Sequence, residues 1–135
     1  MYFILLGEIP SVMQAMPNIV VLYLNSNFLY GGNISSFVAP TMTDLSLSQN
    51  QFSGHFPFEN PSISLKSIYI RQNYLTGSIS VNLTALIHVE KMDFSYNMMT
   101  GTLPTALDMV SRYISVQMYF VSQEYALWFH CLLLQ

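Results

Sequence analysis

Charged residues are scarce in this sequence of 135 residues, at 8%, and seven acidic residues outnumber four Lys and Arg residues. Binding the phosphate backbone of a nucleic acid requires a cluster of positive charge, which so few basic residues do not provide. Hydrophobic residues, in contrast, make up 52%. Disordered chains are poor in apolar residues and rich in charge. The composition therefore indicates one folded domain that does not bind nucleic acid.

The sequence motifs and residue spacings typical of catalytic and metal sites are also missing. A single cysteine, Cys131, excludes an internal disulfide framework and a zinc site built on cysteines. The three histidines have no metal-ligand spacing, and no nucleophile, phosphate-loop or kinase motif occurs. Glu90 and Asp93 lie three residues apart, but a solvated pair fits this strand-like context better than an acid/base pair. We therefore expect no cofactor, no metal and no enzymatic activity.

No apolar run reaches the roughly 20 residues that a membrane-spanning helix needs. The segment 126–134 is apolar but short, and the start at 1–6 has neither the positive charge nor the cleavage site of a signal peptide. We expect residues 122–135 to form an unassigned apolar C-terminal tail. Any membrane attachment would use a segment that is not clearly present here.

A repeated pattern runs along most of the chain. Four asparagines recur at spacings of 23, 23 and 24 residues, namely Asn27, Asn50, Asn73 and Asn97. Each follows an apolar-x-apolar pair, such as Leu45 and Leu47, and precedes an apolar residue and a glycine, such as Phe52 and Gly54. Some seven positions stay in register over four copies, and the period is that of leucine-rich repeats.

The segment after each asparagine narrows the family. Two copies read Asn50-Gln-Phe-Ser-Gly-His-Phe-Pro57 and Asn97-Met-Met-Thr-Gly-Thr-Leu-Pro104. This form resembles the plant-specific leucine-rich repeat of receptor-like kinases, receptor-like proteins and secreted inhibitors of cell-wall-degrading enzymes. The resemblance covers roughly residues 7 to 104. Departures are Ser80, which replaces a proline, and Val121, which stands where a fifth asparagine belongs.

The resemblance implies a leucine-rich repeat solenoid of about four to five repeats. Short parallel β-strands would line its concave face, with irregular or 3-10 turns on the convex side. We place the solenoid at residues 1–121. Its full copies are at about 16–38, 39–61, 62–85 and 86–109, with partial copies at 1–15 and 110–121.

The residue types fit this coil physically. In each copy the x-apolar-x-apolar-x stretch has strand period, so Leu45 and Leu47 point inward while Asp44 and Ser46 point outward. The same alternation predicts that Ser95 points outward. At the end of each strand an asparagine amide, with both donors and an acceptor, can pair backbone groups that no strand pairs. The four asparagines are therefore predicted to form a structural ladder.

Outward strand positions are the candidate binding surface, because solenoids of this kind bind partners on their strand face. Tyrosine and arginine are favoured anchors in interfaces. The predicted ligand- or partner-binding residues are Tyr23, Asn25, Asp44, Ser46, Tyr69, Arg71, Lys91, Asp93 and Tyr96. A plainer interpretation is a solvated surface in which Arg71 pairs with Asp93 across adjacent strands.

Two glycosylation sequons begin at Asn33 and Asn82 and favour an extracellular location. The leading hypothesis is a recognition module from the ectodomain of a plant receptor-like protein or receptor-like kinase. It would take part in signal perception, either outside the cell or on the outer face of the plasma membrane. Its partner would be a peptide or protein ligand, or a co-receptor. The alternatives are a small secreted inhibitor of a cell-wall-degrading enzyme, and a truncated gene product without independent function.

Overall fold

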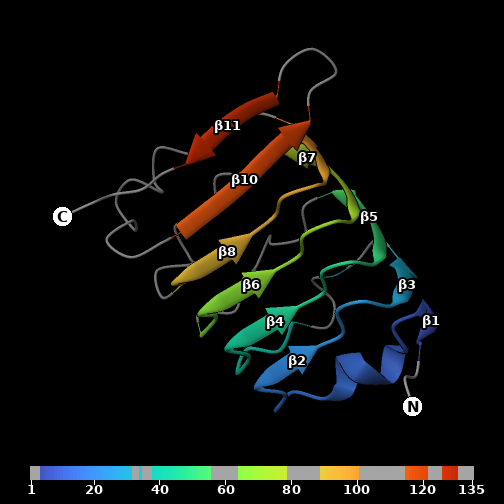
Figure 1. Cartoon of the computed structure of the whole chain (residues 1–135). Helices are drawn as coiled ribbons and strands as arrows, with labels where there is room; N and C mark the ends of the chain where they lie inside the picture. Colours follow the sequence, from blue (N-terminus) through green and yellow to red (C-terminus); the bar gives the residue numbers. More distant parts are fainter. Residues whose placement is uncertain are drawn as a thin grey trace.

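A computed structural model gives the arrangement of the chain (Figure 1). The structure describes residues 4–31, 34, 38–55, 64–78, 89–100, 115–121 and 126–130. Within these residues the backbone coils repeatedly around one axis. Each complete turn carries two short strands, and the strands of successive turns pair into two sheets.

The first sheet, here called the front sheet, contains one strand from each of five successive turns. Its parallel strands are β2 (Val21–Tyr23), β4 (Asp44–Ser46), β6 (Ser67–Tyr69), β8 (Lys91–Asp93) and β10 (Ser115–Val121). Equivalent residues lie side by side, so that Leu22, Leu45, Ile68 and Met92 form one row. This is the predicted solenoid with short parallel strands, and the fold prediction is confirmed.

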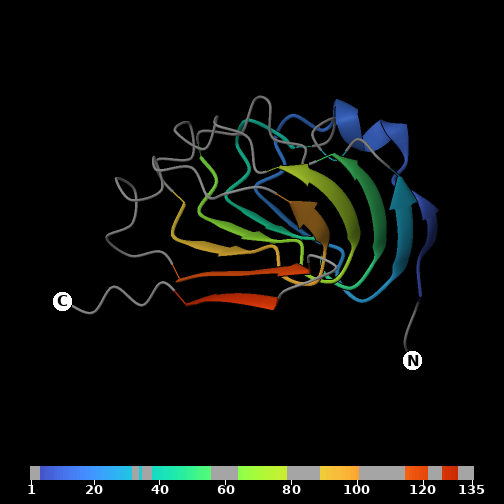
Figure 2. The ribbon, with the colours of Figure 1, turned by 90° about the horizontal axis from the view of Figure 1, so that it is seen from above.

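A second sheet, the side sheet, was not anticipated from the sequence. Its parallel strands are β1 (Leu6–Glu8), β3 (Phe28–Gly31), β5 (Gln51–His55), β7 (Tyr74–Ser78) and β9 (Met98–Thr100). It occupies a side of the coil adjoining the front sheet (Figure 2). These strands follow the ladder asparagines, where x-apolar-x-glycine again has the alternation of a strand. A short 3-10 helix, η1 (Ser11–Ala15), follows β1 in the first turn.

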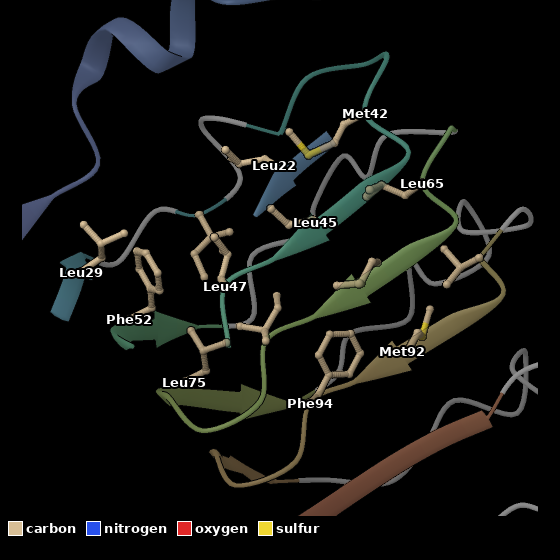
Figure 3. Packing of buried hydrophobic residues seen from close by; sticks show 14 of the residues in the cluster. Leu22, Leu29, Met42, Leu45, Leu47, Phe52, Leu65, Leu75, Met92 and Phe94 are labelled. Atoms are coloured by element: carbon tan, nitrogen blue, oxygen red, sulfur yellow. The ribbon is translucent and has the colours of Figure 1, made fainter. Parts of the chain in front are cut away.

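The core fills the space between the two sheets (Figure 3). Each turn of the front sheet contributes the inward residue of its strand and the apolar residue two positions later. In the turn of β4 these are Leu45 and Leu47, which are both fully buried. The side sheet contributes Leu29, Phe52 and Leu75. Because each turn buries its apolar residues against its neighbours, the stability of one turn depends on the next.

The asparagine side chains tie adjacent turns together at the corner between the sheets. The Nδ2 group of Asn73 donates to the carbonyl of Ile70 in its own turn at 3.2 Å and to that of Leu47 in the preceding turn at 3.1 Å. Its Oδ1 accepts from the backbone N–H of Phe52 at 3.0 Å. Asn50 and Asn97 make the equivalent bonds. These bonds pair backbone groups that both sheets leave unpaired.

A left-handed backbone conformation precedes every ladder asparagine. The φ angles are 60° at Ser26, 58° at Gln49, 57° at Gln72 and 56° at Tyr96. Residues other than glycine adopt positive φ uncommonly, because the Cβ atom crowds the backbone. The repetition at four equivalent positions shows that the sharp corner between the sheets requires this conformation, whichever residue type occupies it.

The C-terminal end of the front sheet departs from the repeat. β10 spans seven residues, whereas the preceding front strands span three. Val121 stands where an asparagine would end the strand, so β10 continues and pairs antiparallel with β11 (Ala126–His130). Part of the tail left unassigned from the sequence thus forms the last strand of the front sheet. Among the described residues, no helix is long and apolar enough to cross a membrane.

Candidate ligand-binding surface

The outward side chains of the front sheet, here called the front face, form ordered rows across the strands. The register aligns Tyr23, Ser46, Tyr69 and Asp93 in one row. A neighbouring row contains Val21, Asp44, Ser67 and Lys91. The strands are about 4.8 Å apart, so a ligand of peptide size would contact several turns at once. All eight residues are at least partly accessible to solvent, and the inward residue between them on each strand is buried.

A hollow of about 320 Å³ lies in this face. It is lined by Tyr23, Asn25, Ser46, Ser48, Gln49 and Tyr69. Four of these six are predicted binding residues, so the structure brings Tyr23, Asn25, Ser46 and Tyr69 together around one depression. Two tyrosines separated by small polar residues form a surface that can both pack against apolar groups and donate hydrogen bonds.

Arg71 and Tyr96 form a second pair next to this hollow. The guanidinium carbon of Arg71 lies 4.6 Å from the centroid of the Tyr96 ring. This geometry is that of a cation–π contact between neighbouring turns. Asp93 instead accepts a hydrogen bond at 3.0 Å from the backbone N–H of Ser95.

Hydrogen bonds hold several polar side chains of the front face in place. The Thr43 hydroxyl donates to Oδ2 of Asp44 at 2.7 Å, and the backbone N–H of Arg71 donates to Oγ of Ser48 at 3.1 Å. Side chains that are fixed before a ligand arrives lose less conformational entropy on binding. The front face is therefore partly preorganised.

Ser95 departs from the prediction. Strand alternation predicted an outward position, but the residue is completely buried, and its hydroxyl has no hydrogen-bond partner among the residues that the structure describes. The physical reason lies in the next turn, where β10 runs past the end of β8 and also lies near β9. The equivalent Ser48 remains partly exposed because its neighbouring turn leaves the sheet at the usual point.

A larger groove of about 500 Å³ follows the corner between the two sheets. Its wall includes the rings of Phe28, Tyr74 and Tyr96 and the amides of Gln49, Gln51 and Gln72. Ser26 and Ile4 also line it, and the ladder residues Asn27, Asn50 and Asn73 contribute to its lining. The Ser26 hydroxyl donates to Oε1 of Gln49 at 2.7 Å. We call this feature the corner groove.

The chemical groups of the front face and the corner groove are those of a recognition surface. Within the described ranges, no group of three or more His, Cys, Asp or Glu side chains lies close enough together to hold a metal ion. The surface offers aromatic rings, amides, hydroxyls and a few charges, which are groups suited to recognition. Asn33 and Asn82, the predicted glycosylation positions, lie outside the described residues.

Comparison with known proteins shows to which family these repeats belong. No family model matches the sequence. Receptor-like protein 7 of Arabidopsis thaliana is 33% identical over 104 residues, which cover 76% of this chain and 10% of that protein. A crystal structure of a TDR receptor has a TM-score of 0.75 and 29% identity, covering 84% of this chain and 20% of that one. The chain is a plant-type leucine-rich repeat protein.

A second similar structure is that of a receptor in a complex. The plant peptide hormone receptor RGFR1, in complex with RGF2, matches this leucine-rich repeat chain with a TM-score of 0.75 and 25% identity. That match covers 85% of this chain and 19% of the receptor chain. The chain spans about a tenth of the length of the curated relatives that it matches.

The corner groove was not predicted, because the leucine-rich repeat motif predicts a single strand in each turn and the groove depends on the second. The position after the ladder asparagine carries Phe28, Gln51, Tyr74 and Met98 in successive turns. Large side chains recurring at that position, next to an inward apolar residue, were the available signal. Of the remaining predicted binding residues, Asp44 and Lys91 lie in the row beside the hollow and do not line it.

Proposed function

We propose that this chain is a non-catalytic recognition module that binds a peptide or protein partner through its front face. The observation that carries the proposal is the hollow in which the register gathers Tyr23, Ser46 and Tyr69. Arg71 lies in the same turn as Tyr69, and Lys91 and Asp93 lie on the next strand, so this side of the face carries charges of both signs, which suit a peptide with mixed side chains. The complex of the related RGFR1 with RGF2 supports a peptide as the type of ligand.

A display selection tests this proposal. The intact chain is immobilised and presented with a library of random peptides, alongside the variants Tyr69→Ala and Tyr30→Ala. Tyr30 is a matched control because it is 46% exposed but lies on the side sheet, outside the hollow. We expect peptides to be enriched on the chain and on Tyr30→Ala, and to be lost on Tyr69→Ala. Equal enrichment on all three proteins would show that the front face is not the binding surface.

We further propose that the module belongs to the ectodomain of a receptor-like protein or receptor-like kinase acting in signal perception, with a co-receptor as a second partner. This places it outside the cell or on the outer face of the plasma membrane. Similarity to receptor-like proteins and receptors, of which the chain matches about a tenth to a fifth, supports this assignment. A small secreted inhibitor of a cell-wall-degrading enzyme uses the same scaffold and is the second candidate.

An immunoblot of source tissue, with and without glycosidase, separates the two candidates. A receptor predicts a glycosidase-sensitive band several times larger than 15.4 kDa. A secreted inhibitor predicts a glycosidase-sensitive band close to that mass. A small band that does not shift with glycosidase would count against an extracellular location for either.

A further inference from the structure

We propose that the corner groove, which adjoins the front-face hollow and shares Gln49 with it, is a second binding site, for a neutral linear oligosaccharide. The groove lies where Ser26, Gln49 and Gln72 turn the chain from the front sheet into the side sheet. The front-face tyrosines Tyr23 and Tyr69 do not line it. This inference does not depend on the proposed peptide site.

The shape of the groove points to a chain-like ligand. Its lining comes from five successive turns, from Ile4 in the first to Tyr96 in the last. At about 4.8 Å between neighbouring strands, the groove extends roughly 20 Å along the coil. Its volume of about 500 Å³ is within the usual range for small-molecule sites. A long groove of modest volume suits several sugar rings in a row better than a single compact molecule.

The charge of the groove points to a neutral ligand. Among the described residues that line it, none is Asp, Glu, Lys, Arg or His. Phosphates, sulfates and carboxylates are recognised through charge-assisted hydrogen bonds from cationic side chains, which this lining does not offer. The neighbouring cation, Arg71, is stacked on the Tyr96 ring.

The aromatic side chains provide platforms for sugar rings. Phe28 and Tyr74 are 48% and 54% exposed, whereas Tyr96, at 50%, has one face of its ring covered by Arg71. A pyranose ring carries C–H groups on its faces and hydroxyls around its edge. Its C–H face packs against the electron-rich face of an aromatic ring. Phe28 and Tyr74 lie on β3 and β7, which are separated by β5 in the side sheet, so separate rings of one chain can pack on each.

The amides supply partners for the sugar hydroxyls. A hydroxyl both donates and accepts, and so does the amide of Gln51 or Gln72. In Gln49 the Oε1 atom already accepts from the Ser26 hydroxyl at 2.7 Å, which leaves Nε2 as the donor of that side chain. Aromatic faces flanked by uncharged donors and acceptors match the alternation of C–H faces and hydroxyls along a neutral oligosaccharide.

Isothermal titration calorimetry of the full chain tests the inference. The probes are two neutral hexamers, cellohexaose and a linear mannohexaose, and one anionic hexamer, hexagalacturonic acid. We expect at least one neutral hexamer to bind and the anionic hexamer not to bind. Tyr74→Ala should weaken neutral binding about tenfold, whereas Tyr74→Phe, which keeps the ring, should bind within about threefold of the original chain.

Matched variants separate the groove from the rest of the surface. Tyr30→Ala removes a tyrosine of similar exposure, 46%, from the same sheet but outside the groove, and Tyr69→Ala alters the front face. Both should leave oligosaccharide binding unchanged, and circular dichroism should show the same fold for all variants. Three results would each overturn the inference: no binding of either neutral hexamer at millimolar concentration, equal binding of hexagalacturonic acid, or equal binding by Tyr74→Ala.

Discussion

Arg71 lies over the ring of Tyr96, with its guanidinium carbon 4.6 Å from the ring centroid. The sequence had left open a pairing of Arg71 with Asp93, which the structure does not show. Arg71 belongs to the front face, and Tyr96 lines the corner groove. This one contact therefore links two neighbouring turns and also the two surfaces to which we assign binding.

A double-mutant cycle measures the strength of this contact. Arg71→Ala, Tyr96→Ala and the double variant are compared by urea unfolding. Because both residues are exposed, we expect a coupling free energy of about 0.5–1 kcal/mol, as for a cation–π pair at the surface. Strict additivity of the two single effects would show that the contact contributes nothing to stability.

Asn73 is predicted to be the most sensitive polar residue in the middle of the coil. Replacing it with alanine leaves the N–H of Phe52 without its side-chain partner, whereas the carbonyls of Leu47 and Ile70 keep the bonds from Asn50 and Asn97. Buried and unpaired backbone groups cost about 1–3 kcal/mol in the free energy of unfolding. Asn25→Ala is the control, because Asn25 is exposed and should change stability by less than about 0.5 kcal/mol. Similar midpoints of urea unfolding for the two variants would contradict the role assigned to the ladder.

The corner conformation predicts opposite responses at two nearby glutamines. Gln49 has a φ of 58°, which a β-branched residue adopts only with strain, so Gln49→Val should destabilise by about 1–2 kcal/mol. Gln51→Val introduces valine at an exposed position of strand β5, where β-branched residues are favoured, and should be neutral or slightly stabilising. Thermal unfolding of both variants checks the difference, and equal destabilisation would rule out backbone strain as its source.

Removing a hydroxyl at Ser95 should stabilise the protein. The Ser95 side chain is fully buried, and within the described part of the chain its Oγ has no hydrogen-bond partner, so Ser95→Ala removes an uncompensated desolvation cost of about 1 kcal/mol. Ser48 occupies the equivalent position two repeats earlier, and its Oγ accepts a hydrogen bond from the N–H of Arg71. Ser48→Ala should therefore be destabilising. If chemical denaturation showed that both variants change the free energy of unfolding in the same direction, the contrast between an unpaired Ser95 and a hydrogen-bonded Ser48 would be wrong.

The coil was predictable because its determinants are local and repeated. Leu45 and Leu47 alternate with polar residues, and Asn50 follows at a fixed distance, so one copy suggests the strand and its end. Repetition at 23 and 24 residues then fixes which residues are neighbours in space. The row of Tyr23, Ser46 and Tyr69 follows directly from that period.

Other features depend on contacts that no single repeat encodes. The burial of Ser95 follows from the length of β10 in the next turn, which in turn reflects the loss of an asparagine at Val121. The corner groove arises from side chains of five turns that meet only once the side sheet has formed. The stacking of Arg71 on Tyr96, in preference to a pair with Asp93, depends on side-chain geometry across two turns.

The most direct test of recognition by the front face is the dissociation constant of a peptide selected on the intact chain, measured for three proteins. We expect Tyr69→Ala to weaken binding by tenfold or more, about 1.4 kcal/mol, because it removes an aromatic anchor from the hollow. Tyr30→Ala, a tyrosine outside the hollow, should bind as the original chain does. A dissociation constant that is unchanged by Tyr69→Ala, or that responds equally to Tyr30→Ala, would contradict the assignment of the binding site to the front face.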